Sequence, residues 1–115
     1  MVPAIAKAYG GEATVEIQNN TAITYNDPEL TSKMLPTLQA VAGEENVVLA
    51  KATTGGEDFS FFQEEVPGFY YFLGGKPLDS TEPAPHHTPD FFIDESGMLL
   101  GVKTMSQLAI DYLNQ

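Results

Sequence analysis

The sequence predicts an α/β fold, because apolar runs typical of buried strands alternate with segments that have the periodicity of helices. Residues 46–50 and 69–73 are short, continuous apolar runs, and a helical segment stands between them at residues 58–65. Strand, helix and strand in this order indicate a βαβ unit with parallel pairing. The length of 115 residues suits one small domain, or a domain plus part of another.

The first element expected is a short helix that ends at a pair of glycines. Residues 2–9 read as one or two helical turns closed by Gly10 and Gly11, with no capping residue before them. Residues 13–18 alternate small or apolar side chains with polar ones and are rich in β-branched types, which predicts a strand with one solvent-exposed face. The pattern changes near Tyr25, where we place a domain boundary.

A longer helix is expected to begin after Asp27. Asp27 can cap it, Pro28 loses no useful hydrogen bond in the first turn, and Glu29 complements the helix dipole. Its apolar face is marked by Leu30, Met34, Leu35, Leu38 and Val41. Pro36 predicts a kink or a split in this helix, and Gly43 is expected to end it.

The last helix is expected after a proline-rich loop at residues 76–92. Asp94 or Ser96 can cap it, so we read the acidic Asp94-Glu95 pair as part of a helix start and not as catalytic. Its apolar stripe consists of Leu99, Val102, Met105, Leu108, Ala109, Tyr112 and Leu113. The aromatic clusters at residues 59–62 and 69–72 are expected in the core, because aromatic side chains bury the largest apolar area.

The charge balance excludes several classes of partner. Sixteen acidic residues against five basic ones give a net charge of -11, and such a surface repels both phosphate backbones and anionic lipids. We therefore expect no binding to nucleic acid or membranes. No apolar run approaches the roughly 20 residues that span a bilayer, and the amino terminus does not resemble a signal peptide, so a cytoplasmic location is expected. The chain has no cysteine, so a metal site would have to use His, Asp and Glu.

Both histidines of the chain stand together in the segment His86-His87-Thr88-Pro89. Loops that follow buried strands are where α/β proteins form ligand sites, and a neutral imidazole is a common zinc ligand. On residue type alone such a pair is more often a feature of the surface than a metal site. The residues by themselves leave both interpretations open.

A second candidate site precedes the helical segment at residues 58–65. Gly55 and Gly56 allow a tight turn or a close approach to a ligand, and Glu57 and Asp58 stand at the helix start. Free N–H groups there could bind a carboxylate or orient these acids. The alternative is a plain strand-to-helix turn with Asp58 as the helix cap. The Gly-Lys-Ser/Thr ending of a phosphate loop is absent.

Taken in order, several motifs of the chain resemble one enzyme family. They are Gly56-Glu57-Asp58-Phe59-Ser60-Phe61, Val66-Pro67-Gly68, Leu73-Gly74, His87-Thr88-Pro89, Phe91 and Asp94-Glu95. They are similar to the aminoacylase and carboxypeptidase type of metallopeptidase, in the branch of hippurate hydrolases, auxin-conjugate hydrolases and N-acyl-amino-acid amidohydrolases. The resemblance runs from about Tyr9 to the end of the chain and includes the Tyr25-Asn26-Asp27 segment.

The resemblance implies an α/β catalytic domain of the zinc-exopeptidase type with an inserted ferredoxin-like lid. Residues 1–24 would be the tail of the lid or dimerisation domain, and residues 25–115 the carboxy-terminal part of the catalytic domain. Two divalent metals are implied, zinc or else manganese, cobalt or nickel, with a glutamate that activates the attacking water. His87 matches the last of the family's metal ligands, whereas His86 stands one position early. The segment that matches the lining of the substrate pocket is Gly55, Gly56, Glu57 and Asp58.

The family's upstream metal ligands and its general base have no counterpart in this sequence, so we expect no catalytic residue in the chain itself. One histidine would hold a metal only weakly, since catalytic sites need at least three protein ligands. We therefore expect the carboxy-terminal part of an amidohydrolase for N-acyl amino acids or peptide-like amides, inactive alone and self-associating through exposed apolar surface. The alternatives are a non-catalytic binding or assembly module of this fold and an unrelated small α/β domain.

Overall fold

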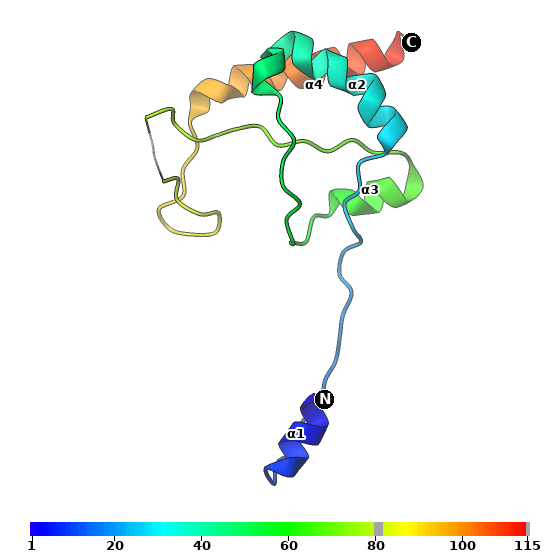
Figure 1. The fold of residues 1–115 in the computed structure, drawn as a ribbon, viewed down its shortest axis with the longest axis vertical. Coiled ribbons are helices and arrows are strands. Elements are labelled where there is room, and N and C mark those ends of the chain that lie inside the picture. The colour runs from blue at the N-terminus through cyan, green and yellow to red at the C-terminus, as the bar shows by residue number, and fades with distance from the viewer. Residues whose placement is uncertain (80–81, 115) are drawn as a thin grey trace.

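Helices provide the regular secondary structure of the described part of the chain. The computed structural model describes residues 1–79 and 82–114. In chain order its elements are α1 (Val2–Ala8), α2 (Pro28–Ala42), the 3-10 turn η1 (Glu44–Asn46), α3 (Phe59–Glu65), the 3-10 turn η2 (Glu95–Gly97) and α4 (Met98–Leu113) (Figure 1). None of the helices within these ranges combines the length and apolar character that crossing a bilayer requires.

Helix α1 stands apart from the other helices at the end of an extended arm (Figure 1). It ends where the glycine pair predicts: Gly10 has a φ of 78°, and the N–H of Gly11 donates to the carbonyl of Ala6 at 2.9 Å. The radius of gyration is 20.1 Å, whereas a compact domain of this length would have about 13 Å. The arm is one reason for this extended shape.

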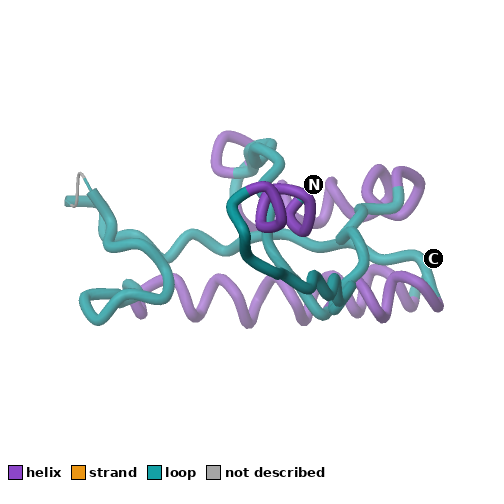
Figure 2. The backbone as a smooth tube through the Cα atoms, turned by 90° about the horizontal axis from the view of Figure 1, so that it is seen from below, coloured by secondary structure: helices purple, strands orange, loops and turns teal. Residues whose placement is uncertain are grey.

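The packed core of the described residues lies between α2 and α4 (Figures 1 and 2). Met34 and Leu38 on the predicted face of α2 are only 3% and 6% exposed. The predicted cap is also confirmed, because the N–H of Leu30 donates to Oδ1 of Asp27 at 2.8 Å. Helix α2 continues through Pro36 to Ala42, so of the expected kink or split the split does not occur, and the kink stays a prediction. The neighbouring turns and the contact with α4 hold the helix together despite the missing N–H.

Helix α4 buries a different face from the predicted stripe. Thr104 is 3% exposed, and the carboxylate of Asp111 accepts hydrogen bonds from Oγ1 of Thr37 at 2.6 Å and from Nε2 of Gln107 at 2.7 Å. Much of the predicted stripe is exposed, namely Leu99, Val102, Met105, Tyr112 and Leu113. Among the described elements α4 packs on α2 and η2 and not on a sheet. Within the described residues no sheet lies over this apolar stripe.

The sheet expected from the sequence does not form within residues 1–79 and 82–114. Each of the segments at residues 13–18, 46–50 and 69–73 is predicted to be a strand. Asn46 belongs to η1, and residues 13–18, 47–50 and 69–73 run as chain without a strand partner; Figure 2 draws none of the described residues as a strand. The prediction that residues 46–50 are buried on both faces is wrong, since Val48 is 79% and Leu49 100% exposed. A helix satisfies its backbone internally, whereas a strand needs a neighbouring strand, and the described segments do not supply one. The α/β class and the lid remnant are therefore not confirmed by this structure.

The aromatic clusters pack on one another but are not enclosed in a core. The rings of Phe59 and Tyr70, one from each cluster, lie 5.4 Å apart, and the rings of Tyr70 and Phe72 lie 5.5 Å apart. Phe61, Phe62 and Phe72 are nevertheless exposed. The prediction of a core position is wrong for these side chains, because no sheet or helix layer lies over them in the described part of the chain.

Candidate functional site

The two adjacent histidines have different surroundings. The ring of His86 packs at a steep angle on Phe91, with centroids 4.7 Å apart. The turn is closed by Oγ1 of Thr88, which donates to the carbonyl of Pro85 at 2.8 Å, and by the N–H of Phe91, which donates to the carbonyl of Thr88 at 3.1 Å. His87 is exposed and has a φ of 64°, a left-handed conformation that is uncommon for residues other than glycine. The loop thus anchors His86 on Phe91 and holds His87 in a strained, accessible position, as residues at functional sites often are.

The described residues do not complete a metal site around His87. Within residues 1–79 and 82–114, no group of three or more His, Cys, Asp or Glu side chains lies close enough together to hold a metal ion. A catalytic zinc site takes three protein ligands and keeps one open position. His87 can supply one imidazole, so by themselves the residues present do not fit the metal that the sequence resemblance implies.

Glu57 is held by two hydrogen bonds, one to each oxygen of its carboxylate. Oε1 accepts from the N–H of Phe59 at 3.0 Å, and Oε2 accepts from the hydroxyl of Tyr70 at 2.9 Å. The bond from Phe59, and after it the bond from Tyr70, holds the pKa of Glu57 below its ordinary value, and the bond to Glu57 raises the pKa of Tyr70. Glu57 therefore caps the start of α3. The alternative in which Asp58 caps this helix is wrong, because its side chain makes no cap hydrogen bond.

Tyr70 is fixed in turn by the segment before α2. The side chain of Asn26 donates from Nδ2 to the carbonyl of Tyr70 and accepts the N–H of Tyr70 at Oδ1, both at 2.8 Å. Gln63 makes the same paired contact with the backbone of Tyr25, at 3.0 Å and 2.9 Å. The side-chain amides of Asn26 and Gln63 thus make the paired hydrogen bonds that a neighbouring strand would make, each with the backbone of a single residue. Sequence reasoning missed Asn26, Gln63 and Tyr70 as partners, since no local pattern indicates contacts this far along the chain.

The four residues predicted to line a substrate pocket lie in the turn before α3. Gly55, Gly56 and Asp58 are exposed, and a Cβ added at Gly55 would meet no heavy atom within 4 Å. This turn and the loop that carries His87 lie apart in Figure 1. The structure therefore does not bring the two candidate sites together.

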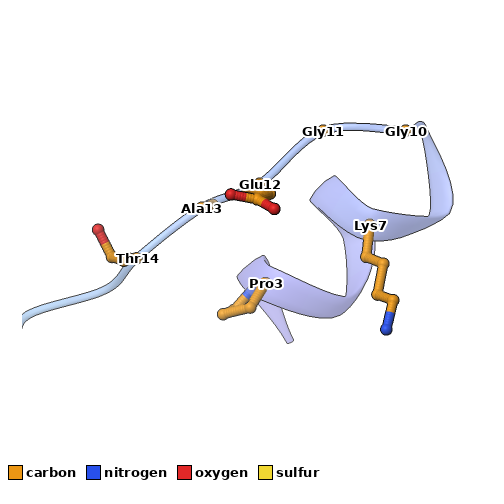
Figure 3. Close-up of a pocket in the computed structure, with 7 residues that line it drawn as sticks. All are labelled: Pro3, Lys7, Gly10, Gly11, Glu12, Ala13 and Thr14. Atoms are coloured by element: carbon orange, nitrogen blue, oxygen red, sulfur yellow. The ribbon is translucent and has the colours of Figure 1, made fainter.

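Two hollows of the structure have neither His87 nor Asp58 in their lining. One, of about 660 Å³, lies between α1 and residues 10–14 (Figure 3), and its lining holds a single carboxylate, Glu12, and no histidine. A second hollow has a volume of about 380 Å³ and is lined by Phe59, Phe69, Tyr70, Tyr71, Leu73, Gly101 and Met105. The first lacks a set of metal ligands and the second is largely apolar, so neither forms a catalytic centre by itself.

This chain is similar to one protein family and to several known proteins. The model of Peptidase family M20/M25/M40 matches residues 3–111. Thermostable carboxypeptidase 2 of Saccharolobus solfataricus is 32% identical over 100% of this chain and 29% of its own length. Putative amidohydrolase YhaA of Bacillus subtilis is 28% identical over 97% of this chain and 28% of its own length. IAA-amino acid hydrolase ILR1-like 6 of Arabidopsis thaliana is 33% identical over 92% of this chain and 24% of its own length. No solved structure matches. The chain thus spans less than a third of the length of each of these relatives.

Proposed function

The chain belongs to Peptidase family M20/M25/M40, and we propose that it is the carboxy-terminal part of a metal-dependent hydrolase that cleaves the amide bond of N-acyl amino acids or related peptide-like conjugates. The observation that carries this proposal is the family match over residues 3–111. Relatives that bear the names of a carboxypeptidase, an amidohydrolase and an amino acid hydrolase support the choice of an amide substrate.

In this proposal His87 is one ligand of a divalent-metal centre, with zinc as the first candidate and manganese, cobalt or nickel as the others. Its strained backbone and exposed ring support that role, whereas the ring of His86 is engaged with Phe91. The remaining ligands and the general base belong to parts of a longer protein outside this chain. Alone, the chain would therefore bind metal weakly and would not catalyse hydrolysis.

The same proposal assigns residues 1–24 to a lid or dimerisation domain and residues 25–115 to the catalytic domain. The separation of α1 and its arm from the α2–α4 pair supports this division (Figure 1). The turn that contains Gly55, Gly56, Glu57 and Asp58 would shape the substrate pocket. A cytoplasmic location remains part of the proposal.

The test uses the complete protein that contains this chain. His87→Ala should lower the content of bound metal and reduce hydrolysis of an N-acyl amino acid by more than about 100-fold, because a direct ligand is lost. The matched control is His86→Ala, which removes the adjacent imidazole and should retain most of the metal. Full metal content and activity in His87→Ala would overturn the ligand assignment. Lack of amide hydrolysis by the unmodified protein with each of the four metals would favour a non-catalytic module.

For this chain produced alone, we propose self-association. Its exposed apolar surface includes Leu49, Leu99 and Leu113, and the unpaired segments at residues 46–50 and 69–73 carry backbone groups that a second copy could pair. Light scattering over a dilution series should show a mass above that of the monomer at the higher concentrations. A monomer at every concentration would contradict this proposal.

A further inference from the structure

We propose that Glu57 is a positioning residue, and that it acts on the substrate only through Asp58. Bonded to Tyr70 and Phe59, it fixes the turn that carries the exposed carboxylate of Asp58. The kinetic part of this inference rests on the proposed amide hydrolysis. It refines the pocket assignment, in which Glu57 and Asp58 have the same role.

The first support is that the carboxylate of Glu57 already accepts hydrogen bonds from within the protein. Each oxygen of its carboxylate accepts one bond, at 3.0 Å from the N–H of Phe59 and at 2.9 Å from the hydroxyl of Tyr70. Hydrogen bonds to an ionised acceptor are among the stronger ones in proteins. A substrate group could use this carboxylate fully only at the expense of one of these bonds.

The second support is that the partner of Glu57 is itself fixed at several points. Asn26 holds both backbone groups of Tyr70 at 2.8 Å, and the ring of Tyr70 lies 5.4 Å from that of Phe59. The hydroxyl of Tyr70 is therefore presented from a held backbone and a packed ring. A chain of contacts runs from Asn26 through Tyr70 and Glu57 to the turn before α3.

The third support is the freedom that the turn would have without Glu57. Gly55 and Gly56 precede it, and glycine has the widest choice of backbone conformations. Asp58 makes no cap hydrogen bond to α3, and its side chain is exposed. The backbone carbonyls of Glu57 and Asp58 accept the N–H groups of Ser60 and Phe61, and the side-chain bonds of Glu57 add a second restraint on the turn. Losing these side-chain bonds would loosen the position of Asp58 relative to a bound substrate.

The experiment compares hydroxyl deletions in the complete protein. Tyr70→Phe keeps the ring and the backbone bonds to Asn26 but removes the bond to Glu57. It should raise KM about fivefold and change kcat by less than about twofold, because an interaction that orients the bound substrate is weakened in ground and transition states alike. Glu57→Gln should have a similar effect. The matched control is Tyr71→Phe, since within the described residues the hydroxyl of Tyr71 has no hydrogen-bond partner.

Double variants show whether Glu57 acts through Asp58. Asp58→Asn alone should raise KM, and Tyr70→Phe added to it should raise KM little further. A full additional rise in the double variant would overturn the inference. So would an unchanged KM in Tyr70→Phe, including the case where only its melting temperature falls, which would indicate a purely structural role.

The anchoring can also be measured without substrate, which separates this inference from the proposed function. If the complete protein hydrolyses no amide, the proposed function fails, and hydrogen exchange then tests the turn. The amide of Phe59 should exchange faster in Tyr70→Phe than in the unmodified protein, with no such change in Tyr71→Phe. Equal exchange in all three proteins would overturn the anchoring.

Discussion

The α2–α4 pair and the segments at residues 46–50 and 69–73 differ in how their backbone groups are satisfied. Each helix makes its own hydrogen bonds, and the pair then buries Met34 and Leu38 and joins Thr37 to Asp111. The two apolar segments are as hydrophobic as any part of the chain, yet no strand pairs with them in the described residues and Leu49 is fully exposed. Hydrophobicity alone did not bury them.

The difference shows which requirements can be met inside a short chain. A helix needs only local sequence and one partner face, whereas a parallel strand needs neighbours on both sides and cover over both faces. The proposal of a longer hydrolase accounts for the contrast, because the partner strands would come from the rest of that protein. Stability within this chain should therefore be concentrated in the helix pair.

The largest expected effect is on the core of the pair. Leu38→Ala should lower the free energy of unfolding by about 2–5 kcal/mol, since it removes buried methyl groups and leaves a cavity. Leu49→Ala makes the same chemical change at an exposed position and should alter it by less than about 0.5 kcal/mol. Urea denaturation followed by helical circular dichroism measures both. Similar losses in the two variants would mean that the stability is not concentrated between α2 and α4.

Helix ends were predictable because the residues that cause them are adjacent in sequence. Asp27 and Pro28 marked the start of α2, and Gly10 marked the end of α1. The buried face of α4 was not predictable in the same way. The apolar residues of its stripe are those that could be buried beneath a sheet. In this structure α4 packs on α2 instead, with Thr104 buried and Asp111 bonded to Thr37.

The same distinction between local sequence signals and long-range contacts applies to the candidate site. The sequence singled out His87 and the Glu57-Asp58 pair, yet it could not show that His87 has a φ of 64° or that His86 rests on Phe91. The bond from Tyr70 to Glu57 depends on the folded path of the chain between them. Side-chain roles that rest on such contacts need the structure, whereas the residue types that suggest chemistry do not.

A smaller loss in the free energy of unfolding is expected when the side chain that caps a helix start is removed. Its size would show how much such a local sequence signal contributes to stability. Asp27→Ala should cost about 1 kcal/mol, because the N–H of Leu30 loses its acceptor. Asp58→Ala is the matched control: Asp58 stands at the same position before α3 but makes no cap bond. It should change the free energy of unfolding by less than about 0.5 kcal/mol. Thermal or urea unfolding compares the two, and a larger loss in Asp58→Ala would contradict the assignment of the cap to Glu57.

The smallest effect concerns the polar contact between α2 and α4. The bond from Thr37, and after it the bond from Gln107, holds the pKa of Asp111 below its ordinary value of 3.8. Because the folded pKa is the lower one, the contribution of this carboxylate to stability is complete above pH 3.8 and is lost as the pH falls through the lowered value. The melting temperature of the unmodified chain should therefore fall more steeply over this acid range than that of Asp111→Asn, which cannot ionise. Parallel profiles would mean that Asp111 bonds Thr37 equally well when protonated. In that case the hydrogen bond would still join α2 to α4 but would not require the charge on Asp111.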